Sequence, residues 1–199
     1  MANYFQLFQR GFKNRYLRKI YIPENKLDCI INHPGGCGGV TLSKHINQFQ
    51  YTNYHIEKEY GYQKAIAHLI KPPSVFYKKK IKVIILKRDL NEIYNSLKKR
   101  GFLRNSLVWY GDLLPFRFFN NDEKKLKKKF TGYLEKFYEN WEKYPDSLKI
   151  VINYPNIFQS IDDQNSLKSF LNIKDQKFIE NFPKFDPYAY EKNFIDPSS

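Results

Sequence analysis

The stretch Lys82-Val-Ile-Ile-Leu-Lys-Arg-Asp-Leu-Asn-Glu-Ile-Tyr-Asn-Ser-Leu-Lys-Lys-Arg100 joins a strand directly to a helix. Residues 82–87 form a β-branched and almost wholly apolar run, which predicts a buried strand. From Leu90 onward the apolar residues recur at helical spacing, and Gly101 stands where a C-terminal cap belongs. A buried strand that runs straight into a helix is typical of α/β proteins with a parallel sheet.

The rest of the chain repeats this alternation of strands and helices. We predict strands at 26–32 and 148–153, a short apolar segment at 64–70, a helix carrying Leu42, Ile46 and Phe49, a helix from Asp122 to Tyr144-Pro145, and a helix at 166–171 started by Asp162 or Asp163. The pattern predicts a three-layer α/β fold of the P-loop-containing nucleotide-binding type, with a parallel central β-sheet flanked by helices. No repeat or linker divides the 199 residues, so we expect a single domain with its motif-bearing core at 26–175.

The composition limits the classes of partner. The net charge is +14, which favours anionic partners such as nucleotides and sulfated or phosphorylated molecules. Most of the basic residues are lysines, however, and a solvated lysine-rich surface explains the charge equally well. Two cysteines, Cys29 in the first strand and Cys37 in the following loop, argue against a disulfide framework. Because no apolar run is long enough to span a membrane, we expect a cytoplasmic protein.

Glycines crowd the stretch Asn32-His-Pro-Gly-Gly-Cys-Gly-Gly-Val-Thr-Leu-Ser-Lys-His45, between the first strand and its helix. Such a loop lets several backbone N–H groups converge on an anion, and the N-terminus of the helix adds positive potential. The predicted phosphate-binding residues are Gly35, Gly36, Cys37, Gly38, Gly39, Val40 and Thr41. The alternative is a glycine-rich connection that binds nothing.

The loop lacks the lysine of a Walker-type motif, because Gly39 stands at the lysine position when the loop is aligned on Thr41. The chain also lacks an apolar strand ending in an aspartate that would hold magnesium. Hydrolysis of ATP or GTP is therefore disfavoured, and no metal site is predicted.

A second anion site is predicted just after the strand at 82–87. Arg88 stands at the carboxyl end of this strand, and Ser96 lies outside the apolar stripe of the following helix. A guanidinium and a hydroxyl held on adjacent rigid elements can bind a phosphate beside the glycine loop. The alternative is an arginine paired with Asp89 or Glu92, and a serine on the surface.

These segments together resemble the sulfotransferases that use 3′-phosphoadenosine 5′-phosphosulfate (PAPS). In that family the strand-loop-helix binds the 5′-phosphosulfate, and an Arg at a strand end and a Ser eight residues later bind the 3′-phosphate. Arg88 and Ser96 match this pair in type and spacing. The segment 65–71 resembles the short strand that carries the family's catalytic histidine, here His68, and 148–173 resembles the family's closing strand and helix.

The resemblance implies in-line transfer of a sulfuryl group from PAPS to a hydroxyl or amine of an acceptor. The nucleotide product would be adenosine 3′,5′-bisphosphate (PAP). The resemblance also implies that His68 is the catalytic base, which suits an imidazole that is neutral near pH 7. His33, just before the glycines, is a second candidate with less support.

The chain departs from the family's pattern in two places. The basic residue that the family carries in the loop is replaced by Gly35 or by Cys37, depending on the alignment. Losing such a donor typically costs about 3 kcal/mol in the transition state. Lys44 and Lys71 are the remaining candidates to supply the charge. The family's distal glycine-rich, basic segment is not evident in residues 174–199.

The aromatic stretch 102–121 is the predicted acceptor region, although the same rings fit an ordinary core. The acceptor itself, a small molecule, glycan or peptide, is not defined by the sequence. Three alternatives stay open: a relative that binds PAPS or PAP with weak or no transfer, an atypical P-loop kinase that prefers ATP with magnesium, and a basic nucleic-acid binder. The last rests on charge and aromatic content alone, so no specific nucleic acid is expected as a partner.

Overall fold

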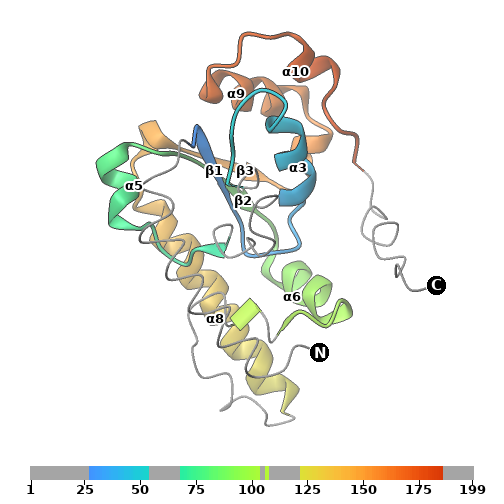
Figure 1. The fold of residues 1–199 in the computed structure, drawn as a ribbon. Coiled ribbons are helices and arrows are strands. Elements are labelled where there is room, and N and C mark those ends of the chain that lie inside the picture. The colour runs from blue at the N-terminus through green and yellow to red at the C-terminus, as the bar shows by residue number, and fades with distance from the viewer. Residues whose placement is uncertain (1–26, 54–67, 104–105, 108–121, 186–199) are drawn as a thin grey trace, which may run out of the picture.

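The computed structural model describes residues 27–53, 68–103, 106–107 and 122–185. In these ranges the centre of the molecule is a parallel sheet of three strands in the order β1-β2-β3 (Figure 1). The strands are β1 Cys29–Asn32, β2 Lys82–Lys87 and β3 Lys149–Asn153. The predicted α/β fold with a parallel sheet is thus confirmed.

Helices occupy the connections between the strands, as parallel pairing requires. Between β1 and β2 lie α3 Gly39–Ile46 and α5 Ser74–Lys79. Between β2 and β3 lie α6 Leu90–Lys99, α8 Glu123–Glu142 and the short 3₁₀ helix η4 Asp146–Leu148. After β3 come the short 3₁₀ helix η5 Asn156–Phe158, α9 Ile161–Leu171 and α10 Lys177–Glu180. No described helix combines the length and the apolar character needed to cross a bilayer.

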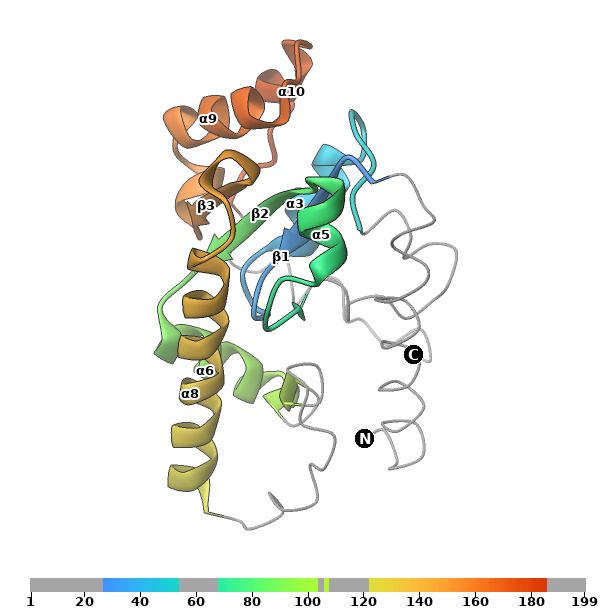
Figure 2. The ribbon, with the colours of Figure 1, turned by 90° about the vertical axis from the view of Figure 1, so that its left-hand side faces the viewer.

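The sheet is covered by helices on both faces. Alternate residues of each strand point to opposite sides of the sheet, and the side chains on each side pack against different helices. Ile84 and Leu86 of β2 pack in a cluster with residues of α3, α6, α9 and α10. Val83 and Ile85 pack in a second cluster with α5 and the C-terminal half of α8. Figure 1 shows α5 beside one end of α8, with α3 on the other side of the strands. Figure 2 shows α6 beside α8, and α9 next to α10 at the opposite end of the molecule. The three layers predicted from the sequence are therefore present.

Helix α8 contributes side chains to both clusters. Phe130 and Leu134 in its first half belong to the cluster of α3 and α6, whereas Phe137 and Trp141 in its second half belong to the cluster of α5. In the second half, the Tyr138 hydroxyl accepts a hydrogen bond from the backbone N–H of Arg88, the residue after β2, at 3.3 Å. The helix therefore runs across one end of the sheet and is fixed to the carboxyl end of β2.

The end of β1 is held by two side-chain amides. The Asn32 amide bonds both backbone groups of Leu69, with N–O distances of 3.0 and 3.1 Å. The Asn53 amide does the same for Ile31, at 2.8 and 3.1 Å. All four residues are buried, so these bonds satisfy backbone groups that water cannot reach. The loop that follows β1 therefore starts from a fixed point.

Some predicted boundaries were wrong, each for a local reason. The last long helix begins at Ile161 because Ser160, and not Asp162 or Asp163, is its N-cap and accepts the N–H of Asp163. Helix α5 was not predicted, because Pro73 reads as a terminator but precedes the first residue of a helix here.

Two further predictions concern the start of β1 and the segment 64–70. The first strand begins at Cys29, because this is the first residue that pairs with β2, opposite Lys82. Of the segment 64–70, residues 64–67 lie outside the described ranges, and residues 68–70 form no strand.

Candidate functional site

The glycine loop leads from β1 into α3 at the carboxyl edge of the sheet. Gly38 is the N-cap of α3 and has left-handed backbone, with φ of 69°. A Cβ on Gly38 would come within 2.8 Å of the Tyr154 ring, and a Cβ on Gly39 would come within 2.1 Å of His33 Nε2. These glycines are therefore required by backbone conformation and packing, whether or not the loop binds a ligand.

The loop presents a run of backbone donors. The N–H of Gly35 donates to His33 Nδ1 at 3.1 Å, and the N–H of Leu42 donates to the Gly38 carbonyl at 3.0 Å. Between them, from Gly36 to Thr41, no backbone N–H donates a hydrogen bond to any described residue. Consecutive N–H groups at the start of a helix are the usual backbone site for an anion.

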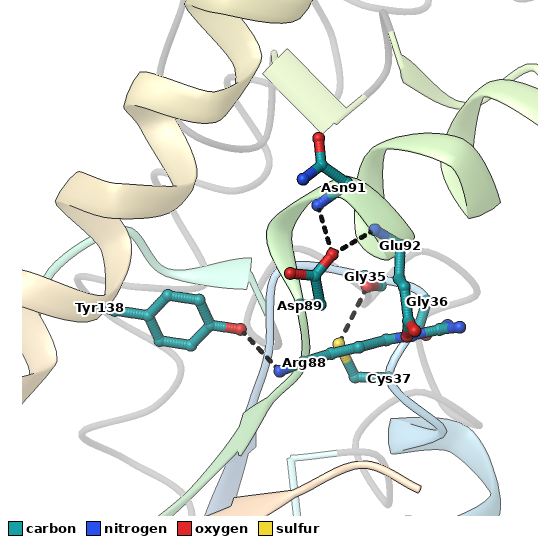
Figure 3. Close-up of polar contacts among 8 residues, drawn as sticks. All are labelled: Gly35, Gly36, Cys37, Arg88, Asp89, Asn91, Glu92 and Tyr138. Atoms are coloured by element: carbon teal, nitrogen blue, oxygen red, sulfur yellow. Dashed lines mark hydrogen bonds and ion pairs between the residues drawn. The ribbon is translucent and has the colours of Figure 1, made fainter.

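Arg88 reaches the glycine loop from the end of β2, as Figure 3 shows. Its Nη1 donates to the Gly36 carbonyl at 2.6 Å, its Nε donates to Glu92 at 2.8 Å, and its guanidinium lies 4.8 Å from the centre of the Tyr154 ring. The pairing with Glu92 predicted as an alternative thus occurs together with contact to the loop. Asp89 instead caps α6, where its carboxylate accepts two backbone N–H groups (Figure 3).

Ser96 also faces the loop, and Arg100 lies beside it. A Cβ placed on Gly36, whose φ is 66°, would come within 3.1 Å of Ser96 Oγ and 3.0 Å of Arg100 Nη2. Arg100 Nε donates to the Ser96 carbonyl at 3.0 Å, which holds the guanidinium in this position. The structure therefore brings Arg88, Ser96 and the glycine loop together at Gly36, and adds a second guanidinium. Two like charges at one residue favour an anion between them.

His68 lies beneath the loop and is 3% exposed. Its Nδ1 donates to the His33 carbonyl at 2.5 Å, because a carbonyl can only accept. In a neutral ring this leaves Nε2 as the basic nitrogen. The His33 ring lies edge-on to His68, with centroids 4.7 Å apart, and its Nδ1 accepts from Gly35. Both histidines are thus next to the loop, and the role of His68 as a base stays a prediction.

No positive charge comes from the loop itself. Cys37 is fully buried, its Sγ donates to the Gly35 carbonyl at 3.1 Å, and burial raises the pKa of its thiol to about 12. Lys44 lies exposed in the last turn of α3, and Lys71 is exposed as well. Among the described residues, Arg88 and Arg100 are the cations that the structure places beside Gly36.

Sequence reasoning missed Tyr154 and Arg100. Tyr154 directly follows β3, so it stands at the same edge of the sheet as Arg88, and this signal was available. Arg100 comes four residues after Ser96, and residues at that spacing share one face of a helix. This second signal was available too.

A pocket of about 590 Å³ opens next to the site, between α8 and the carboxyl ends of β2 and β3. Its lining residues are Lys87, Arg88, Asp89, Leu90, Glu135, Tyr138, Glu139, Glu142, Asn153, Tyr154 and Asn156. Arg88 and Tyr154 belong both to this pocket and to the surroundings of the glycine loop. Most of the predicted acceptor region, residues 104–105 and 108–121, lies outside the described ranges.

Comparison with protein-family models, with curated proteins and with solved structures finds no match to this chain. In the described ranges, no group of three or more His, Cys, Asp or Glu side chains is placed to hold a metal ion. The chemistry of the site therefore has to be inferred from the groups that meet at Gly36.

Proposed function

We propose that the glycine loop, Arg88 and Ser96 bind PAPS, and that the protein transfers its sulfuryl group to a hydroxyl or amine of an acceptor. The observation that carries the proposal is that Arg88 and Ser96 both meet the glycine loop at Gly36. The loop supplies backbone N–H groups that make no hydrogen bond to the described residues, and the two side chains supply a guanidinium and a hydroxyl. A nucleotide with phosphate groups on both its 5′ and 3′ oxygens satisfies both sets of donors.

In the proposed reaction the acceptor oxygen or nitrogen attacks the sulfur of PAPS in line with the leaving group. The bond between sulfur and the bridging oxygen of the 5′-phosphate breaks, and PAP leaves with that oxygen. The loop N–H groups stabilise the charge that develops on the phosphate. We assign the acceptor's proton to Nε2 of His68, because Nδ1 already donates to the His33 carbonyl.

A relative with weak or no transfer activity is the second candidate, and one observation favours it. Gly35 and Cys37 occupy the two positions where a loop cation is expected, and the Cys37 thiol stays neutral because burial raises its pKa to about 12. A site of this kind can bind the nucleotide through its remaining donors and still stabilise the transition state poorly. Such a protein would bind PAP with an affinity like that of an active enzyme but would transfer the sulfuryl group slowly.

The binding step is tested by titration calorimetry of the full chain with PAP, AMP and ATP with magnesium. We expect PAP to bind more tightly than AMP, and Arg88→Ala to remove this preference. Lys78→Ala is the control for net charge, because it removes one positive charge from an exposed side chain of α5 that does not line the pocket. Equal affinities for PAP and AMP, or a preference for ATP with magnesium, would contradict the proposal and favour a kinase-like protein.

The chemical step is tested by following the release of PAP from PAPS with acceptors that carry phenol, alcohol or amine groups. Acceptor-dependent release that is lost in His68→Ala supports transfer with His68 as the base. Tight binding of PAP without acceptor-dependent release identifies the second candidate.

A further inference from the structure

The sheet has one edge that the rest of the described chain leaves open. β3 lies at this edge, with β2 between it and β1 (Figure 2). The backbone N–H of Tyr154 donates to the Lys87 carbonyl at 2.7 Å, in register with the pairing of Asn153 and Lys87. Successive residues of a strand direct their backbone groups to opposite sides, so Ile152 also bonds to β2, whereas Val151 and Asn153 direct theirs outward. Neither of these two outward N–H groups donates to a described residue.

The opposite edge of the sheet, along β1, is covered. There the Asn53 amide bonds both backbone groups of Ile31, and the Tyr51 carbonyl accepts the N–H of Cys29 at 3.4 Å. At the β3 edge the outward groups face solvent, since Val151 is 47% exposed and the residues on either side of it are partly buried. Exposed backbone groups on an edge strand are a template for pairing with another strand.

The usual devices that block such an edge are missing from β3. Edge strands are commonly protected by a proline, a bulge or a charged side chain. Residues 149–153 contain no proline, pair with β2 without a break in register, and carry a charge only at Lys149. The Lys149 ammonium contacts the Asp146 carboxylate at 2.7 Å and donates to the carbonyls of Glu142 and Tyr144, and its side chain is 11% exposed. The charge is therefore neutralised and held against the end of α8, so it does not guard the edge.

From this geometry we infer that β3 is a dimerisation strand. Two copies of the chain pair antiparallel through β3 about a twofold axis at Val151, and their sheets join into one. In this register Val151 exchanges both backbone bonds with Val151 of the second copy, and the Asn153 N–H donates to the Lys149 carbonyl of the second copy. Ile150 lies opposite Ile152 of the second copy. The strand is its own complement, because β-branched side chains face each other and no like charges meet.

The charge of the protein determines the strength of this contact and its dependence on salt. Each copy carries +14, so two copies repel each other. A single strand pair belongs to the smallest class of interface, below about 1,200 Å², so we expect a weak dimer with a dissociation constant of roughly 10 μM to 1 mM. Because salt screens the repulsion, the dimer should tighten as the salt concentration rises, whereas an association held by ion pairs would weaken. The inference is independent of the proposed function.

The test is sedimentation velocity of the full chain over a hundredfold range of concentration, at low and high salt. We expect the dimer fraction to rise with concentration, and the dissociation constant to fall at least about threefold between about 0.1 and 0.5 M salt. Val151→Lys should remove the dimer without changing the urea midpoint, because it places two like charges opposite each other at the axis. Val151→Thr keeps the β-branched shape and should keep the dimer. Gln48→Lys, in the segment that follows α3, adds the same charge at an exposed position and is the matched control.

A Val151→Cys variant locates the contact. The Cα atoms of a directly opposed, hydrogen-bonded antiparallel pair lie about 5.5 Å apart, which is within disulfide range. Mild oxidation should therefore cross-link two copies of this variant. The native Cys29 and Cys37 do not compete, because both are fully buried.

A chain that stays monomeric at every concentration overturns the inference. So does a dimer that Val151→Lys leaves intact, or one that weakens as salt is added. Slow hydrogen exchange at the Val151 and Asn153 amides of the dilute monomer would overturn it as well, because another part of the same chain would then cover the edge.

Discussion

Replacing Glu92 with Gln distinguishes a binding role of Arg88 from a purely structural one. In the described structure the Glu92 carboxylate accepts from Arg88 Nε at 2.8 Å, and the two side chains are 56% and 21% exposed. If Arg88 binds a phosphate, Glu92 repels that phosphate and competes for the guanidinium. Glu92→Gln should then bind PAP more tightly. If the only role of Arg88 is to hold the loop through the Gly36 carbonyl, losing the charge of Glu92 weakens the position of Arg88 and cannot strengthen binding of PAP.

The size of the effect follows from the charges. A phosphate on Arg88 would lie about 6 Å from the Glu92 carboxylate, where two unit charges in water repel by about 0.7 kcal/mol and a dianion by about 1.4 kcal/mol. That corresponds to about tenfold in affinity at low salt. At 0.15 M salt the screening length is about 8 Å, so about threefold should remain. The free energy of unfolding should fall by only about 0.3–0.5 kcal/mol, because the pair is exposed.

The assay is calorimetric titration of PAP into wild type and Glu92→Gln at two salt concentrations, with urea unfolding of both proteins. Glu180→Gln on α10 is the control, because it changes the net charge equally on an exposed residue away from the loop. Tighter binding by Glu92→Gln at low salt, with the gain shrinking as salt rises, supports phosphate binding at Arg88. Unchanged or weaker binding at both concentrations refutes the reasoning.

Three further predictions concern the glycine loop and the helix that follows it. Gly39→Ala should lower the free energy of unfolding by about 2–3 kcal/mol in urea, because its Cβ would lie 2.1 Å from His33 Nε2; an unchanged midpoint would contradict this packing. Cys37 should resist alkylation by iodoacetamide at pH 8 until the chain is unfolded, since burial raises its thiol pKa to about 12, and rapid labelling of the native chain would count against that burial. Burial also lowers the pKa of His45 below its ordinary 6.5, so the unfolded chain binds more protons than the folded chain as the pH falls. The contribution of His45 to the free energy of unfolding should therefore be fully present above pH 6.5 and be lost as the pH drops below it. In urea unfolding between pH 5 and 8, the free energy of unfolding should depend less on pH for His45→Gln than for the wild type. An equal dependence on pH in the two proteins would contradict the assignment to His45.

Local signals in the sequence were enough to predict the elements whose first and last residues are marked by capping residues or by a β-branched run. The run of β-branched residues in β2 and the left-handed Gly101 after α6 marked that unit correctly. Asp122 likewise caps α8, where its carboxylate accepts the N–H of Lys125. The start of α9 was misplaced because Ser160 and the acidic residues after it are all good N-caps, and only the backbone geometry selects one of them.

The residues that surround Gly36 were harder to predict because they come from separate parts of the chain. Arg88 was predicted from its place at a strand end and Ser96 from its place outside the apolar stripe, and both matched a resemblance in type and spacing. The structure places both beside the loop. Tyr154 and Arg100 reach the same place because β3 lies next to β2 and because α6 lies alongside the loop. The sequence signals for Tyr154 and Arg100 gave only the sheet edge and the helix face on which they stand; neither packing relation follows from periodicity in a single sequence.

The position of α8 has a consequence for how this protein unfolds. Since one helix fills the hydrophobic clusters on both faces of the sheet, neither face can open without withdrawing side chains from the other. In hydrogen exchange, the slowest amides on both faces of the sheet should therefore exchange with the same free energy of opening, as parts of one cooperative unit. Tyr138 joins this helix to the residue after β2, which is Arg88. A ligand held at the glycine loop would accordingly slow exchange on both sides of the sheet, including at amides far from the loop.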